Sequence, residues 1–188
     1  MMLPCLLIKP ALEYLPSYKS ALERGWGPDN LREAEAAREH LARIATDAEL
    51  FVALHDDPQA LAGPVTLPDG SQVARLPGIT RWLWDGEFCG SINLRWQNGT
   101  SALPSHVLGH IGFSVVPWKR RLGHATRTLA LLLPEARAQG LEYVELTTAP
   151  DNIASQKVIL ANGGQVIERF RKAAAYGGDE GLRFRIVF

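Results

Sequence analysis

One stretch of this chain constrains its fold and its chemistry more than any other: SVVPWKRRLGHATRTLALLLPEA, from Ser114 to Ala136. A run with strand composition ends at Pro117, a basic cluster and Gly123 follow, and apolar residues then recur at helical spacing. A strand that turns directly into a helix leaves the first N–H groups of that helix unpaired, at the positive end of its dipole. This junction predicts an anion site, and Gly123, which has no Cβ, lets a bulky anion approach the backbone.

The residues around this junction leave the identity of its ligand open. Arg120, Arg121 and Arg127 add positive charge, so a pyrophosphate is the simplest ligand. A plain helix start with solvated basic side chains is the competing interpretation. A nucleotide-binding module is a third, although the lysine and threonine pair of a phosphate loop is missing.

Hydrophobic patterns along the chain predict one mixed α/β domain over residues 1–188. The unit from Leu108 to Thr148 should form a right-handed parallel crossover in a mixed sheet with helices on both faces. A segment rich in proline and glycine, residues 56–78, is expected as a long surface loop and a candidate substrate-side flap. Strands are expected over residues 5–9, 79–84, 88–96, 108–116, 141–148, 165–173 and 181–188. Helices are expected over residues 11–26, beginning late or broken at Pro16, over 31–50, capped by Asp29 or Asn30, over 121–139, and over 152–162.

Charge and composition argue against several functional classes. Lysine plus arginine and aspartate plus glutamate both number 20, so the net charge is zero, which argues against a general nucleic-acid or membrane-surface binder. The apolar beginning lacks the basic region of a signal peptide, and we expect a cytoplasmic protein. Cys5 and Cys89 match no disulfide framework or CxxC pattern. His106 and His110 are four residues apart but lack a clustered carboxylate, so we expect no metal.

Three sequence blocks carry a family resemblance. Arg120-x-x-Gly123-x-Ala125 is similar to the Q/R-x-x-G-x-G/A acetyl-CoA signature of the GNAT superfamily of N-acetyltransferases. GHIGFSVVP resembles the strand that precedes this signature, and DNIASQKVILANGG resembles the next conserved block. The resemblance extends from about residue 80 to the end, and before that it rests on the order of the elements. It implies a mostly antiparallel sheet of six to seven strands around a central parallel crossover.

The same resemblance implies an activity and its partners. Acetyl-CoA would be the co-substrate, without a metal, and the acetyl group would pass to an amine of a small molecule or peptide. A homodimer through terminal strands is expected by analogy. The backbone of the preceding strand would pair with pantetheine, and the N–H groups from Arg121 to Thr126 would surround the pyrophosphate. The implied cofactor contacts are Val115, Val116, Arg120, Arg121, Leu122, Gly123, His124, Ala125, Thr126, Asn152 and Ser155.

The sequence offers candidate bases but lacks the family's usual acid. Glu145 and His110 are the candidates for the general base, and a structural hydrogen-bonding role is open for each. His124 is expected to pack near phosphate. Many members carry a tyrosine where this chain has Ile159, which cannot donate a proton. A non-catalytic acyl-CoA-binding or sensor domain is therefore the alternative to an N-acetyltransferase.

The acceptor side is marked by residues on two adjoining strands. Trp82, Trp84 and Arg95 are candidates for lining an acceptor pocket. Burial in the core is the competing interpretation for the tryptophans.

Overall fold

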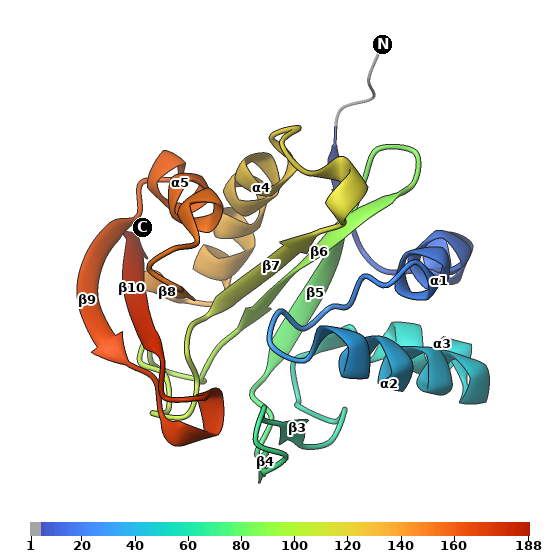
Figure 1. Cartoon of the computed structure of the whole chain (residues 1–188), viewed down its shortest axis with the longest axis horizontal. Coiled ribbons are helices and arrows are strands. Elements are labelled where there is room, and N and C mark those ends of the chain that lie inside the picture. Colours follow the sequence, from blue (N-terminus) through green and yellow to red (C-terminus); the bar gives the residue numbers. More distant parts are fainter. Residues whose placement is uncertain (1–4) are drawn as a thin grey trace.

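The computed structural model describes residues 5–188 and shows a mixed α/β architecture, as expected (Figure 1). The strands are β1 (Leu6–Ile8), β2 (Asp56–Asp57), β3 (Val65–Thr66), β4 (Gln72–Val73), β5 (Gly78–Trp84), β6 (Phe88–Arg95), β7 (Ile111–Val115), β8 (Tyr143–Thr148), β9 (Gln165–Arg171) and β10 (Glu180–Val187). The helices are α1 (Leu15–Glu23), α2 (Glu33–Thr46), α3 (Ala48–Ala53), α4 (His124–Ala138) and α5 (Ile153–Ala161). Among the described residues, no helix is both long and apolar enough to cross a membrane.

Apart from the β3–β4 hairpin, the strands form two antiparallel sheets that meet between β7 and β8. One sheet has the order β1-β5-β6-β7 with β2 on β5, and the other has the order β8-β10-β9. The chain passes from β7 through α4 into β8, in the order expected for the crossover. Within residues 5–188, however, β7 and β8 do not pair as neighbouring strands of one sheet. The His110 N–H donates to the Glu145 carbonyl at 2.7 Å, and β7 then diverges from β8 (Figure 1). The mixed sheet is therefore split at this point, beside the end of β7.

Helices cover both faces of the larger sheet, and each face has its own apolar core. Strand β6 alternates, so Ile92 and Leu94 pack with Leu129 and Leu132 of α4. On the opposite face, a second cluster forms around Tyr18 and the α1–α3 helices. Ser91, Asn93 and Arg95 alternate with the first set and therefore face the α1–α3 side of the sheet.

Three helix boundaries differ from the sequence expectation. The segment expected as one helix over 31–50 is divided at Asp47, whose carboxylate accepts the Leu50 N–H at 2.9 Å and starts α3. The Asn30 side chain caps no helix and instead donates to the Phe113 carbonyl at 3.2 Å. Helix α4 begins at His124 rather than Arg121, because a left-handed residue at 121 cannot belong to a right-handed helix.

The expected long loop over residues 56–78 contains more structure than its composition indicated. It includes β2, which pairs with β5, and the small β3–β4 hairpin. The buried Asp57 carboxylate accepts the N–H groups of Leu61 and Ala62, at 2.6 and 2.8 Å, and fixes the turn between these strands. This segment thus contains defined strands and turns, and it lies beside β5.

Candidate active site

An open cleft of about 1830 Å³ extends from the β3–β4 hairpin, across the faces of β5–β7, to the beginnings of α4 and α5. The candidate residues that line it are Val115, Arg120, Arg121, Gly123, His124, Ala125, Thr126, Asn152, Ser155, Trp82 and Arg95. The candidates that do not line it are Val116, Leu122, Trp84, His110 and Glu145. The cleft thus brings together most of the expected cofactor contacts but neither expected base.

The loop before α4 forms a concave backbone site. Arg121 and Gly123 both have positive φ, 62° and 77°, and they flank one residue. Successive N–H groups in such a turn point to a common centre, which is an anion-binding nest. The first N–H that bonds back within the helix is that of Arg127, to the Gly123 carbonyl at 3.1 Å. The N–H groups of residues 124–126 have no intrahelical acceptor and add to the nest.

The edge of β7 that faces away from β6 is set by the register. The Val116 N–H donates to the Cys89 carbonyl at 2.9 Å, which directs that backbone group to β6. By alternation, the backbone groups of Phe113 and Val115 face the other edge, toward the divergence from β8. The Arg120 guanidinium donates to the Val115 carbonyl at 3.1 Å. Its side chain is thus folded onto the strand end, whereas the sequence placed it beside the anion.

The beginning of α5 lies on the same cleft and is held by its own cap. The Asn152 carboxamide oxygen accepts the Ser155 N–H at 3.1 Å. At the other end of α5, the Asn162 carboxamide donates to the Thr126 carbonyl at 3.1 Å. This contact links α5 to the first turn of α4, and its only signal in the sequence is an asparagine at a helix end.

The His124 side chain points away from the expected phosphate position. Its imidazole is 5% exposed, and Nε2 lies 3.6 Å from the Asp85 carboxylate. Three side-chain atoms that could bind a metal, from Asp85, Cys89 and His124, lie within 4.8 Å of one another. The Lys119 ammonium lies 3.0 Å from the same carboxylate and already neutralises it. This cluster anchors the start of α4 to the β5–β6 turn.

His110 connects the two sheets through its side chain as well as its backbone. Its Nδ1 accepts the Glu145 N–H at 2.9 Å, so the lone pair needed by a base is already engaged. Burial lowers the pKa of His110 to about 4, although the Glu145 carboxylate acts in the opposite direction. The imidazole is therefore neutral near pH 7, and its position favours the structural role.

Replacing His110 with asparagine should reduce the acid sensitivity of the fold. An unfolded imidazole titrates at about 6.5, so the contribution of His110 to stability is complete above that pH and is lost as pH falls toward about 4. Between pH 7 and 5 this loss amounts to about 2 kcal/mol for one residue. Urea unfolding at both pH values should show that difference shrinking in His110→Asn. An unchanged difference would mean that His110 is protonated in the native state.

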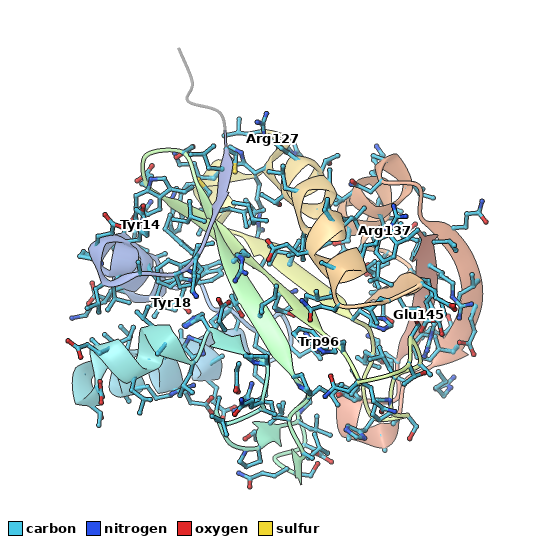
Figure 2. The ribbon with its side chains drawn as sticks, turned by 180° about the vertical axis from the view of Figure 1, so that it is seen from behind. Tyr14, Tyr18, Trp96, Arg127, Arg137 and Glu145 are labelled. Atoms are coloured by element: carbon cyan, nitrogen blue, oxygen red, sulfur yellow. The ribbon has the colours of Figure 1, made fainter. Side chains whose placement is uncertain are left out.

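Glu145 lies in the smaller sheet, in contact with two arginines. Its carboxylate bonds the Arg183 guanidinium at 3.2 Å and the Arg185 guanidinium at 2.5 Å, and its side chain is 8% exposed. Figure 2 shows Glu145 beside the end of α4 that carries Arg137, whereas Arg127 lies at the opposite end, near the nest. A carboxylate paired with two cations and distant from the nest is poorly suited to remove a proton there.

The aromatic candidates divide between the cleft and the core. Trp82 is fully buried and stacks on Tyr18 at 4.5 Å, with its edge at the cleft. Trp84 packs against Tyr14, with ring centroids 4.7 Å apart, outside the cleft.

Ile159 is 1% exposed and packs closely on Gly164, because a Cβ added at Gly164 would lie 2.4 Å from the Ile159 side chain. Ile159 thus serves the packing of α5.

Comparisons with known proteins agree with this geometry. The sequence profile described as "Acetyltransferase (GNAT) family" matches residues 19–163. No curated protein matches the sequence.

Solved structures resemble the whole chain. The microcin C7 self-immunity acetyltransferase MccE, in complex with acetyl-CoA and AMP, aligns with a TM-score of 0.63 and 12% identity, covering 98% of this chain and 92% of that one. RimL, a ribosomal L7/L12 α-N-protein acetyltransferase in complex with coenzyme A, aligns with a TM-score of 0.64 and 12% identity, covering 100% and 98%. A GNAT-family acetyltransferase from Bacillus anthracis has a TM-score of 0.60 at 13% identity, covering 100% and 98%. These likenesses show the fold, and the profile match over most of the chain shows the family. The chain therefore belongs to the GNAT family of acetyltransferases, enzymes that take an acetyl group from acetyl-CoA.

Proposed function

We propose that this protein transfers the acetyl group of acetyl-CoA to an amine, with the diphosphate of the cofactor in the nest before α4. The observation that carries the proposal is the pair of left-handed residues, Arg121 and Gly123, at the mouth of a helix that borders the cleft. Pantetheine would extend along the edge of β7 that faces away from β6 and bond its N–H groups, because Asn30 and Arg120 already bond the Phe113 and Val115 carbonyl groups. Because that edge presents Phe113 and Val115, Phe113 takes the place that the sequence assigned to Val116.

The chemistry that fits this cleft is direct attack of a neutral amine on the thioester. Holding the amine and thioester in line would supply much of the rate. The Val115 N–H faces the divergence between β7 and β8 and would stabilise the developing oxyanion. Neither Glu145 nor His110 lines the cleft, so we assign the amine proton to a water chain over the polar floor of Ser91 and Asn93. Water would also protonate the thiolate, because Ile159 occupies the usual tyrosine position.

Glu145→Gln tests whether this carboxylate is a base or a structural residue. Losing one negative charge between two arginines should lower the free energy of unfolding by roughly 2 kcal/mol, measured by urea unfolding. The pH profile of kcat/KM should keep its shape. Glu168→Gln is the matched control, since Glu168 also pairs with Arg183 but is 51% exposed, and its effect should be small. A pH profile in which Glu145→Gln loses the fall of kcat/KM at low pH would restore Glu145 as the base.

Calorimetric titration with CoA and thiol release from acetyl-CoA over a panel of amines test the function itself. Binding with turnover supports the acetyltransferase. Binding without turnover on any amine would instead support the acyl-CoA sensor that the Ile159 position leaves open.

Three further assignments belong to this proposal. We place the protein in the cytoplasm, where its two free, buried cysteines would stay reduced. A homodimer is proposed by analogy with the family. The loop over residues 56–78, which lines the cleft, would shape the acceptor side.

A further inference from the structure

The floor of the cleft carries a row of polar side chains that the cofactor does not explain. Ser91, Asn93 and Arg95 alternate along β6 and face the cleft, opposite the apolar core under α4. The Arg95 Nη2 donates to the Asn93 carboxamide oxygen at 2.6 Å. A Cβ on Gly112 of β7 would lie 3.4 Å from the same Nη2, so the guanidinium lies over Gly112.

Among the half-buried arginines that the structure describes, Arg95 and Arg75 have no carboxylate partner, and the Arg75 Nε donates to the Gly63 carbonyl at 2.7 Å. Arg32, Arg81 and Arg183 each pair with two carboxylates. Over residues 5–188, no carboxylate lies within ion-pair distance of Arg95, whose one side-chain acceptor is the neutral Asn93. A guanidinium taken from water needs such a partner, because an unpaired buried charge is costly.

The charges around Arg95 leave its positive charge uncancelled. Burial lowers the pKa of Arg95, and the positive charge of Arg75 acts in the same direction. Asp29 acts in the opposite direction from a distance, while its carboxylate accepts the N–H groups of Leu31 and Arg32. Tyr176, which also lines the cleft, donates its hydroxyl to the His106 carbonyl at 2.7 Å. An incoming carboxylate would thus meet a cationic, partly dry end of the cleft.

The register gives the distance between this end and the proposed reaction centre. The guanidinium lies over Gly112, and Val115 is three residues further along β7, which corresponds to about 10 Å in a strand. The amine and carboxylate of a free α-amino acid are only about 3 Å apart. A carboxylate on the second or third residue of an extended peptide, or at the end of a long ω-amino acid, spans the distance.

We propose that the acceptor carries a carboxylate about 10 Å from its reactive amine and that Arg95 binds this carboxylate at the far end of the cleft floor. The inference rests on the proposed function, because the thioester against Val115 sets the position of the amine. Arg95 is thus a specificity residue of the acceptor site.

Matched peptides with a free amino terminus and an amidated carboxyl terminus test the proposal. They carry glutamate or glutamine at the second or third position and otherwise the same sequence. With wild-type enzyme and acetyl-CoA, kcat/KM should be roughly 10- to 100-fold higher for a glutamate peptide than for its glutamine partner. Arg95→Gln should remove that ratio while the Kd for CoA stays unchanged. Arg95→Lys should keep part of the ratio, because it retains the charge but loses the planar fork.

Arg137→Gln is the matched control, because Arg137 is an exposed arginine of α4 outside the cleft, and it should keep the full ratio. If Arg95→Gln fails to fold, the glutamate-to-glutamine ratio of the wild-type enzyme decides. Equal rates on both peptides, or an unchanged ratio in Arg95→Gln, would overturn the proposal. The proposal would also be overturned if the enzyme binds CoA but acetylates only amines that carry no carboxylate. Absence of CoA binding would instead overturn the proposed function, and the acceptor proposal with it.

Discussion

Gly123→Glu should weaken CoA binding roughly 100- to 1,000-fold while the protein stays folded. Gly123 has φ +77° and open space where a Cβ would lie, so a side chain fits without a clash but strains the backbone by about 1–2 kcal/mol. The new carboxylate would lie at the nest and repel a diphosphate, a cost of about 4 kcal/mol for two charges 4 Å apart near a protein surface. Calorimetric titration with CoA measures the loss.

Gly140→Glu separates the backbone strain from the loss of the anion site. Gly140 has φ +80° and the same open space, but it follows the other end of α4 and does not line the cleft. Its glutamate variant should lose similar stability and bind CoA like the wild type. If Gly123→Glu binds CoA equally well, the diphosphate does not occupy this loop.

Gly90→Ala should cost roughly 3–5 kcal/mol of folding free energy, the largest stability effect that we expect. Gly90 has φ +151°, and a Cβ there would lie 2.2 Å from the Ser114 carbonyl oxygen, a backbone atom with little freedom to move. The register between β5 and β6 shifts between Leu83, which pairs with Gly90, and Trp84, as in a β-bulge. Relief of the clash requires β6 and β7 to separate, which would also displace the edge at Val115.

Urea unfolding should show this loss in Gly90→Ala, with Gly99→Ala as the control. Gly99 has φ +76° and open space around the missing Cβ, so alanine there adds only strain of about 1–2 kcal/mol. Equal midpoints for the two variants would contradict the close approach of β6 and β7.

The sequence predicted the parts of this protein that local physics controls. The turn at Gly123 between β7 and α4, the late start of α1 at Leu15 next to Pro16, and the antiparallel pair β9–β10 follow from residue type and periodicity. The three blocks that resemble GNAT motifs indicated the family together, because each block consists of contiguous residues that can be read from the sequence. The positive φ of Arg121 could not be predicted in this way, because arginine rarely adopts this conformation.

Tertiary structure decided which side chains are available for chemistry. Residue type made Glu145 and His110 candidate bases, but pairing across β8–β10 engages the Glu145 carboxylate with Arg185, and the junction of the two sheets engages the His110 lone pair. Within residues 5–188, the same long-range packing places no carboxylate at ion-pair distance from Arg95 on the cleft floor. A charge is free or neutralised according to what lies across from it in space, and those partners come from strands that are far apart in the sequence.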